Sequence, residues 1–348
     1  MVAPAQRCTI LGIETSCDET SAAVVVNGRE VLSNIVSSQV ELHARYGGVV
    51  PEIAARAHIE QLRPIIDEAL TQAGMKLAEL DALAVTDGPG LIGSLLIGVT
   101  AAKTLALLHN LPLVAVDHIQ AHATSAAMVA ANSIWPAVSL VVSGGHTSLY
   151  LVRDFLNIEL LGQTVDDAAG EAFDKVAAIL ELGYPGGPLI DQLARQGNRA
   201  AIRFPRTWLK DERMDFSYSG LKTAVLYHVH GPGRKYGSTA HLSQSQLADI
   251  AASFQAALVE PLVVKAIAAA RRTDVRRVTL GGGVAANSHL RAELAAACAD
   301  AGLKLHLTPS NYCTDNAAMI AALGFHKLQA GQIADLTLEP RGGLLRGA

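Results

Sequence analysis

The chain contains 348 residues, of which 50% are hydrophobic and 17% charged, with 28 Lys or Arg against 32 Asp or Glu. This low charge and apolar excess exclude an intrinsically disordered chain, and the length predicts about two lobes at roughly 150 residues each. A sequence pI of about 6.3 excludes a general polyanion-binding domain, because such domains usually exceed a pI of roughly 9. Any nucleic-acid contact must therefore be local.

The four cysteines lie far apart and form no C-x-x-C pair, which predicts a protein of the reducing cytoplasm; they are Cys8, Cys17, Cys298 and Cys313. No apolar segment typical of a signal peptide follows Arg7. The longest apolar stretch, 91–116, contains Lys103 and Pro112. We therefore expect it to form a buried core helix followed by a strand, not a membrane span.

Strand-like β-branched runs alternate with segments of helical periodicity along the chain, which favours an α/β fold. Residues 10–39 and 138–164 each read as strand, turn, strand, turn, strand. Two copies of one unit would place two turns opposite each other across a cleft, whereas two unrelated β-meanders would not. The pattern leaves both interpretations open. The clearest strands are expected at 8–14, 82–88, 111–117, 138–144 and 277–283.

Three glycine-containing turns follow predicted strands, at 87–94, 143–148 and 281–287, and a fourth at 184–188 contains two prolines. Glycine lets backbone N–H groups approach an anion, and a helix N-terminus behind the turn adds a favourable dipole. None of the turns has the spacing of a Walker A motif or of the dinucleotide fingerprint. They are candidate phosphate loops, with ordinary tight turns as the alternative.

His118 and His122 lie four residues apart behind Asp117, a candidate helix N-cap. On a helix this spacing puts both imidazoles on one face, where they can bind one metal ion; a buried or capping pair is the alternative. The H-E-x-x-H pattern of metalloproteases needs Glu where this chain has Ile119, so peptide hydrolysis is not expected. Asp315, at the predicted start of a helix, is a candidate third ligand, and N-capping that helix is its alternative role.

Ten segments resemble the bacterial TsaD family of tRNA adenosine N6-threonylcarbamoyltransferases and cover nearly the whole chain in the family's order. A small departure is Ser288 and His289 after Asn287, where Arg or Lys often follows. The segments are GIETSCDET (12–20), SQVELHARYGGVVPEIAARAH (38–58), TDGPGLIGSLLIG (86–98), DHIQAH (117–122), LVVSGGHT (140–147), DDAAGEAFDK (166–175), YPGGP (184–188), DFSYSGLKT (215–223), GGGVAANSHLR (281–291) and CTDNAAMIA (313–321).

The resemblance implies the two-lobed α/β fold of actin, Hsp70 and sugar kinases, with duplicated βββαβα units and an inter-lobe cleft. We expect residues 1–134 and a C-terminal segment of about 325–348 to form the first lobe, and residues 135–324 to form the second.

By resemblance, His118, His122 and Asp315 bind one divalent metal, with Fe²⁺ as the first expectation and Zn²⁺ as the alternative. Glu14, His118 and His122 are the expected catalytic residues; Glu14 faces the cleft from the first hairpin turn, and its role stays open. The adenylate part of the substrate is expected to lie against Val141, Val142, Ser143, Gly144, Gly145, Asp174, Gly187, Asp191 and Asn287.

The family transfers a threonylcarbamoyl group from threonylcarbamoyl-AMP, made by a separate synthase, to N6 of the adenosine 3′ of the anticodon in tRNAs that read codons beginning with A. The resemblance implies tRNA, the TsaB paralogue and the ATPase TsaE as partners. It leaves open whether this chain binds and hydrolyses ATP. The densest positive charge lies at 203–213, with Lys222, Arg341 and Arg346, where a solvated surface and a tRNA groove are equally good interpretations.

Two other functions fit the same fold class. A sugar or acetate kinase would need a carboxylate base beside a hydroxyl acceptor and Mg²⁺ held through phosphates, and would have no use for a His-His-Asp site. An ATP-binding scaffold subunit would have no reason to keep metal ligands. The pair His118 and His122 therefore favours the transferase.

Overall fold

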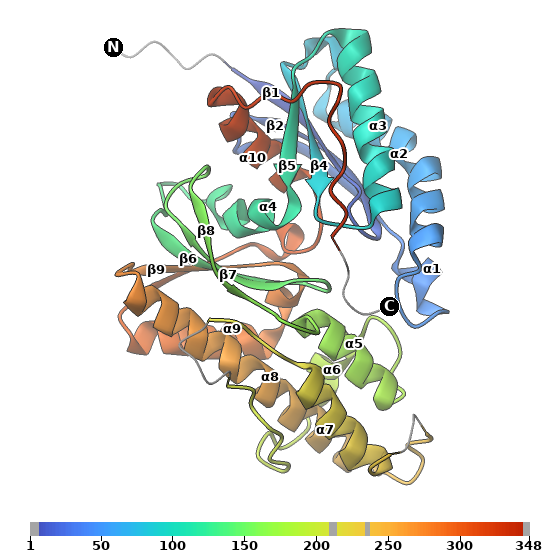
Figure 1. Ribbon diagram of the computed structural model, residues 1–348, viewed down its shortest axis with the longest axis vertical. Coiled ribbons are helices and arrows are strands. Elements are labelled where there is room, and N and C mark those ends of the chain that lie inside the picture. Colours follow the sequence, from blue (N-terminus) through green and yellow to red (C-terminus); the bar gives the residue numbers. More distant parts are fainter. Residues whose placement is uncertain (1–6, 209–213, 234–236, 344–348) are drawn as a thin grey trace.

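The computed structural model describes residues 7–208, 214–233 and 237–343 and consists of two lobes, each built around a five-stranded sheet (Figure 1). The first sheet has the strand order β3-β2-β1-β4-β5, in which β1, β2 and β3 are antiparallel and β4 and β5 run parallel to β1. Its strands are β1 (Thr9–Glu14), β2 (Glu19–Val26), β3 (Glu30–Ser38), β4 (Ala82–Gly88) and β5 (Leu113–Asp117).

The second sheet repeats this topology. Its order is β10-β9-β6-β7-β8, with an antiparallel meander β6–β8 followed by the parallel strands β9 and β10. The same order and directions in both sheets confirm the predicted duplication and exclude two unrelated meanders. The strands are β6 (Ala137–Val142), β7 (Thr147–Val152), β8 (Ile158–Gln163), β9 (Arg277–Gly281) and β10 (Lys304–Leu307).

Helices cover both faces of the first sheet, which explains why β1 is buried at every position. Leu11 and Ile13 face α2 and α3, whereas Ile10 faces α10 on the opposite side. The helices of this lobe are α1 (Val40–Ala44), α2 (Pro51–Ala73), the 3₁₀ turn η1 (Leu77–Glu79), α3 (Ile92–His109), α4 (His118–Thr124), η2 (Ser125–Ala127) and α10 (Ala317–Gln329).

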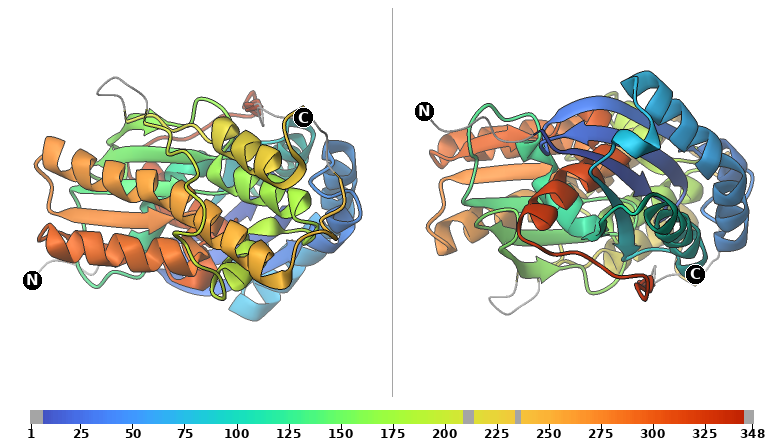
Figure 2. Two further views of the ribbon diagram at one scale, coloured as in Figure 1. Left: turned by 90° about the horizontal axis from the view of Figure 1, so that it is seen from below. Right: turned by 90° about the horizontal axis from the view of Figure 1, so that it is seen from above.

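The outer face of the second sheet packs in one large core with the long helix α8 and its neighbours. Seen from below, α8 and α9 lie side by side across this sheet (Figure 2). The helices are α5 (Ala169–Ile179), α6 (Gly186–Ala194), α7 (Ser219–His230), α8 (Gln244–Arg272), η3 (Gly283–Ala286), α9 (Ser288–Asp300) and η4 (Ser310–Tyr312).

A central layer of α4 and α10 lies between the two sheets (Figure 1). On one side α10 packs against β1, β2 and β4, and on the other α4 packs against β6 and β9. Gly12 permits the close approach of α10, because a Cβ atom there would lie 2.3 Å from the carbonyl oxygen of Ala317. The layer carries the predicted histidine pair into the space between the lobes.

The chain returns to the first lobe earlier than we expected. All of α10, including 317–324, packs on the first sheet, so the expected boundary between 324 and 325 is wrong. The reason is that α10 is apolar on the face that covers β1 and β4, and this helix cannot be divided between lobes. The following tail continues along the first lobe, where Ala334 pairs with Leu113.

Two helices of the described chain, α3 and α8, are long and apolar enough in composition to span a membrane. In α8, 89% of the most apolar window is buried, so it is a core helix; in α3 the buried share is 33%. The expected order for 91–116, a helix followed by a strand, is therefore correct. The expectation that the helix is buried is wrong. Because α3 lies at the outside of its lobe, its outer side chains, such as Leu107 and Leu108, have no layer above them.

Candidate active site

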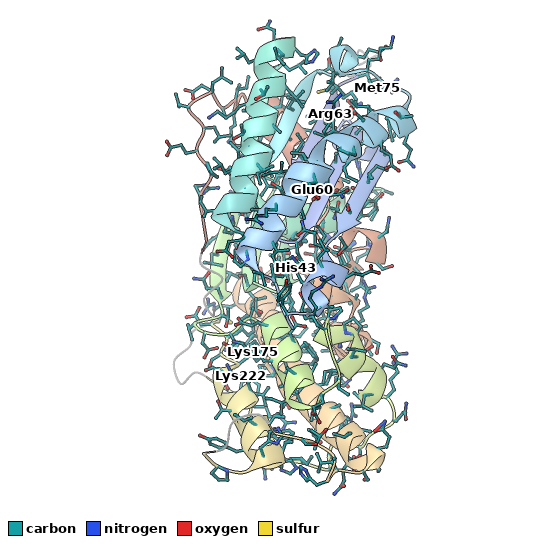
Figure 3. The ribbon with its side chains drawn as sticks, turned by 90° about the vertical axis from the view of Figure 1, so that its right-hand side faces the viewer. His43, Glu60, Arg63, Met75, Lys175 and Lys222 are labelled. Carbon is teal, nitrogen blue, oxygen red and sulfur yellow. The ribbon has the colours of Figure 1, made fainter. Side chains whose placement is uncertain are left out.

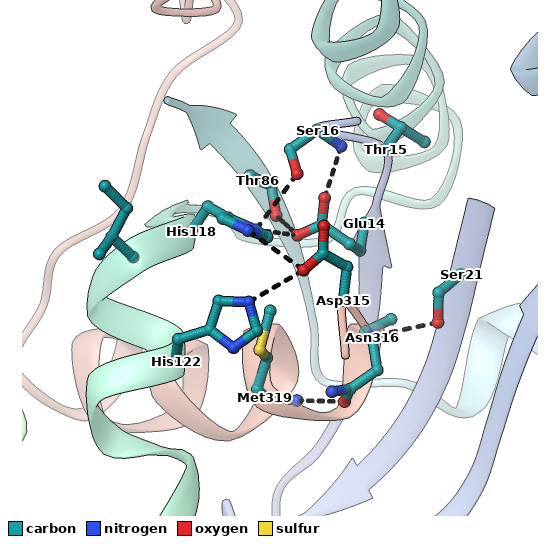
Figure 4. Close-up of polar contacts among 12 residues, drawn as sticks. Glu14, Thr15, Ser16, Ser21, Thr86, His118, His122, Asp315, Asn316 and Met319 are labelled. Carbon is teal, nitrogen blue, oxygen red and sulfur yellow. Dashed lines mark hydrogen bonds and ion pairs between the residues drawn. The ribbon is translucent and has the colours of Figure 1, made fainter. Parts of the chain in front are cut away.

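The two histidines lie on one face of α4 and point toward Asp315 (Figure 4). Asp117 caps this helix, as predicted, by accepting hydrogen bonds from the backbone N–H groups of Ile119 and Gln120. The ring centroids of His118 and His122 are 4.7 Å apart. Nε2 of His122 lies 2.9 Å and Nε2 of His118 lies 3.5 Å from the same carboxylate oxygen of Asp315.

Asp315 does not cap the helix that follows it, which was its alternative role. Asn316 is the N-cap of α10, and its side chain accepts a hydrogen bond from the N–H of Met319. Because the neighbouring residue caps the helix, the carboxylate of Asp315 is free to face the imidazoles of His118 and His122.

Glu14, at the end of β1, holds the other side of His118. Its Oε2 lies 2.9 Å from Nδ1 of His118 and accepts a hydrogen bond of 2.7 Å from Thr86. Its Oε1 accepts a hydrogen bond from the backbone N–H of Ser16. The fully buried carboxylate thus fixes the proton on Nδ1 and turns Nε2 of His118 toward Asp315.

The charges of this cluster are strongly coupled. Burial works against charge at every member, but the Asp315 and Glu14 carboxylates outweigh it and raise the pKa of His118 well above its usual range. In return, His118 and His122 hold the pKa of Asp315 well below its usual value despite burial. Burial is the main cause that lowers the pKa of His122.

The donor set fits a divalent transition metal. The ligating atoms of His118, His122 and Asp315 lie within 4.8 Å of one another. Two imidazoles and one carboxylate are ligands that both iron and zinc accept, and a carboxylate behind a ligating histidine is a common supporting contact. In the described part of the chain, Nδ1 of His122 is buried without a hydrogen-bond partner, so this ring is held by packing and by Asp315.

A cleft of about 680 Å³ adjoins the cluster, and hairpin turns from both lobes line it. The β1–β2 turn contributes Ser16 to Asp18, and the equivalent β6–β7 turn contributes Ser143 to His146. All four candidate phosphate loops reach this cleft. Seven of the nine residues expected to contact the adenylate line it: Ser143, Gly144, Gly145, Asp174, Gly187, Asp191 and Asn287.

Val141 and Val142 are not among the residues that line the cleft, and their expected contact with the adenylate stays a prediction. Both side chains lie in β6 and are fully buried, Val141 on the α4 side and Val142 in the core of the second lobe. In a strand covered on both faces, alternate side chains point into the cores on either side of the sheet. The chain becomes accessible from the cleft only after the end of β6, at Ser143.

The turn at 143–145 is tied to the start of α5. The carbonyl oxygens of Ser143 and Gly144 accept hydrogen bonds from the N–H groups of Gly170 and Glu171. A Cβ on Gly170 would lie 2.6 Å from the Ser143 oxygen, so this glycine permits the contact. The N–H groups of Gly144 and Gly145 bond no other described residue and are available to an anion.

Sequence reasoning missed several residues of the cleft. Asp18 and Glu19 lie on the first hairpin turn, and burial together with Asp18 raises the pKa of Glu19 well above its usual range. His146 lies beside His118, and burial lowers its pKa to about 4, so it is neutral. Arg195 also lines the cleft and pairs with Asp191. The duplication could have revealed Asp18 and Glu19, because it makes the turn after β1 equivalent to the glycine turn after β6, which was already a candidate phosphate loop.

The basic residues singled out in the sequence do not form one surface. Lys222 forms an ion pair with Asp167, and Asp167 also pairs with Lys175. Both lysines lie on the same side of the molecule as His43 (Figure 3). Arg341 is paired with Asp87 of the first lobe. Residues 209–213 and Arg346 lie outside the described residues.

Solved structures at low identity share the fold. The chain aligns over 95% of its length with 49% of HypF from T. kodakarensis, with a TM-score of 0.62 and 16% identity. It also aligns over 92% of its length with 99% of the (R)-2-hydroxyglutaryl-CoA dehydratase component A of Acidaminococcus fermentans, with a TM-score of 0.52 and 17% identity. These likenesses confirm the two-lobed architecture.

Much closer relatives exist by sequence. The chain is 53% identical to the tRNA N6-adenosine threonylcarbamoyltransferase of Anaeromyxobacter dehalogenans, over 95% of this chain and 98% of the relative. It is 50% identical to the Bacillus subtilis protein of the same name, over 92% and 91% of the two chains. The family model TsaD, described as tRNA N6-adenosine threonylcarbamoyltransferase, matches residues 30–322. With the relatives matched over nearly their full length, the chain belongs to the tRNA N6-adenosine threonylcarbamoyltransferase family.

Proposed function

We propose that this protein transfers the threonylcarbamoyl group of threonylcarbamoyl-AMP to N6 of the adenosine 3′ of the anticodon in tRNAs that read codons beginning with A. The observation that carries the proposal is the convergence of His118, His122 and Asp315, backed by Glu14, beside a cleft bordered by equivalent turns of both lobes. The relatives at about half identity, whose names state this transfer, support it.

The reaction sets simple demands on the site. The exocyclic amine of adenine is a poor nucleophile, because its lone pair is delocalised into the ring, so the acyl carbon must arrive activated as a mixed anhydride. The protein then has to position two reactants and stabilise negative charge on oxygen. A cleft that closes around the adenylate from two lobes meets the first demand.

A divalent ion held by His118, His122 and Asp315, with Fe²⁺ and Zn²⁺ both suited to these ligands, would supply Lewis acidity toward an acyl or phosphate oxygen. Glu14 keeps the proton of His118 on Nδ1 and so leaves Nε2 as the ligating atom.

Other residues of the chain bind and orient the adenylate. The N–H groups of Gly144 and Gly145 can donate to its phosphate, and Arg195, with its side chain 65% exposed, brings a positive charge to the cleft. Asp191 is held by Arg195 and Ser288, which fixes its carboxylate at the wall of the site. A hydrogen-bonding side chain so placed suits the sugar or base of a nucleotide.

The double variant His118→Ala/His122→Ala tests this function. We expect loss of bound metal, measured by elemental analysis, and loss of threonylcarbamoyl transfer, measured by mass analysis of tRNA nucleosides. The fold should persist, as judged by circular dichroism. His241→Ala, which changes an exposed histidine of the second lobe, is the matched control. Transfer that continues in the metal-free double variant would contradict the proposal.

The kinase and scaffold functions are less well supported. A kinase or scaffold would bind nucleotide without needing a transition metal, so purified protein that carries nucleotide and lacks metal would favour them. The relatives from Anaeromyxobacter dehalogenans and Bacillus subtilis, which match nearly the whole chain, are named as transferases. A cytoplasmic location is part of our proposal and is consistent with four free cysteines.

We also propose a TsaB-like paralogue and a TsaE-like ATPase as partners, with the donor made by a separate synthase. The outer face of α3 supports a protein partner, because apolar side chains gather on it next to α2. Exposed apolar patches on a soluble protein commonly mark interaction sites. The exposed residues are Ile59 on α2 at 66%, and Ile92, Leu96, Leu107 and Leu108 on α3 at 56%, 53%, 67% and 71%.

A further inference from the structure

A second large hollow, of about 960 Å³, lies on the second lobe outside the cleft. We call it the arginine groove. Three arginines of the loop after α6 line it together with apolar side chains of α8 and the first turns of α9. The residues that line it include Arg199, Arg203, Phe204, Arg206, Trp208, Val263, His289 and Glu293.

The lining of the groove has three arginines and two glutamates, a small positive excess in a chain of net charge −4. Arg199 pairs with Glu293 at 2.7 Å and Arg206 pairs with Glu260 at 2.9 Å, and all four of these groups are at least partly exposed. Arg203 is exposed and has no carboxylate partner within 7–208, 214–233 and 237–343. Exposed ion pairs contribute little to stability, so the paired arginines can exchange carboxylates for phosphates at small cost.

An aromatic side chain stands at the edge of this charge. Trp208 is 46% exposed, whereas Phe204 is buried beneath the same loop. Apolar side chains of α8, such as Val263, also line the groove. Exposed aromatic rings beside arginines are the usual components of sites for unpaired nucleotides, because every base can stack on a ring while its phosphates meet the charges.

The groove and the active-site cleft are lined from neighbouring stretches of the same two parts of the chain. Asp191 on α6 and Arg195 at its end line the cleft, and Arg199, in the loop after α6, lines the groove. On the other wall, Asn287 lines the cleft and His289 lines the groove. The hydrogen bond of 2.8 Å from Ser288 to Asp191 joins the two walls at the boundary.

We infer that the arginine groove binds the unpaired nucleotides of the tRNA anticodon loop that flank the target adenosine. This inference rests on the proposed function, because it takes the acceptor to be a single adenosine of a loop, inserted into the cleft with its neighbours outside. Its neighbours in the loop must then lie just outside the cleft, on the side where Ser288 and Asp191 join α9 to α6. Arg203 contacts the backbone, and Trp208 stacks on a base.

The test measures binding of an anticodon stem-loop RNA to the full-length chain by fluorescence anisotropy at several salt concentrations. Trp208→Ala should weaken binding roughly fivefold or more, the loss typical of one base-stacking contact, and Trp208→Tyr should restore it. Arg203→Ala should reduce the slope of log affinity against log salt by about 0.7, the value for one phosphate of a single strand. Arg29→Ala, at the β2–β3 turn far from the cleft, is the matched control.

Metal content and threonylcarbamoyl-AMP binding should be unchanged in these variants, which separates this inference from the proposed function. If the wild-type chain binds the stem-loop and the variants bind it equally well, the groove is not the contact surface. If the wild-type chain does not bind the RNA, the inference is overturned. If RNA binding depends on Trp208 and Arg203 but no transfer occurs, the groove is supported and the proposed activity is contradicted.

Discussion

Oε2 of Glu14 lies 2.9 Å from Nδ1 of His118, so a carboxylate on the first strand determines which nitrogen of a histidine on α4 faces Asp315. The two residues are 104 positions apart in the sequence. Sheet pairing brings them together, because β1 and β5 both flank β4 and their carboxyl ends meet at one edge.

Glu14→Gln should therefore weaken metal binding while preserving the volume of the side chain. Loss of a carboxylate behind a ligating histidine typically lowers metal affinity roughly 10- to 100-fold. Competition with a chelator, followed by elemental analysis, measures the change. Glu159→Gln, which alters an exposed carboxylate of β8, is the control, and equal affinity in both variants would show that Glu14 does not support the metal.

Asp174→Asn should stabilise the protein at neutral pH. Burial is the main cause that raises the pKa of Asp174 from 3.8 to about 6. At about 1.4 kcal/mol per pKa unit, ionising this group costs the folded state roughly 3 kcal/mol above pH 6. An amide oxygen can still accept the hydrogen bond from the N–H of Gly186.

The gain should depend on pH in a defined direction. Because the folded-state pKa is raised, the cost is absent below pH 3.8, grows between 3.8 and 6, and is constant at higher pH. In urea unfolding at about pH 7, the variant should therefore show a large gain in the free energy of unfolding over the wild type. At about pH 4 this gain should be below about 1 kcal/mol. A gain that is the same at both pH values would contradict a charged, desolvated Asp174.

Gly12→Ala should destabilise the first lobe. The added Cβ would lie 2.3 Å from the Ala317 oxygen and 2.9 Å from the backbone nitrogen of Ala321, and a helix backbone cannot move as a side chain can. We expect a loss at or above the upper end of the about 1–3 kcal/mol typical of overpacked cores. Gly48→Ala, where an added Cβ meets nothing within 4 Å, should change the free energy of unfolding little, and similar losses in both variants would contradict the close α10 contact.

Leu96→Glu combined with Leu107→Glu should disrupt association with a TsaB-like partner. Both side chains are more than half exposed, so the unfolding temperature should stay close to that of the wild type. We expect at least about a tenfold loss of affinity in a binding titration, as for residues central to an interface. Leu160→Glu on β8, also exposed, is the control; undiminished binding by the α3 variant would place the interface elsewhere.

The sequence predicted what depends on local pattern. The predicted strands at 8–14 and 277–283 lie close to the observed β1 and β9, because each run combines β-branched and apolar residues and a turn follows it. The N-cap role of Asp117 and the shared face of His118 and His122 follow from helix periodicity, and the structure confirms both. Asp315 could be named from the sequence only as a candidate third ligand with N-capping as its alternative role, because no local pattern links it to α4; the family resemblance favoured the ligand.

Other features depend on tertiary contacts that pattern does not encode. Val141 and Val142 adjoin the glycine turn in sequence, yet sheet burial removes them from the cleft. Asp18 and Glu19 read as ordinary turn residues until the second lobe faces them. The exposed face of α3 is as apolar as that of a core helix, but α3 is the outermost layer of its lobe, so this face stays exposed.

Synthesis order and folding order differ in this protein. The N–H of Ala317 donates to Ser21 across 296 positions, and α10 provides one of the two layers that cover the first sheet. A ribosome therefore releases the N-terminal strands long before the helix that completes their core. Because non-local contacts slow folding and leave apolar surface open in the meantime, we expect the nascent first lobe to need chaperone protection until translation passes α10.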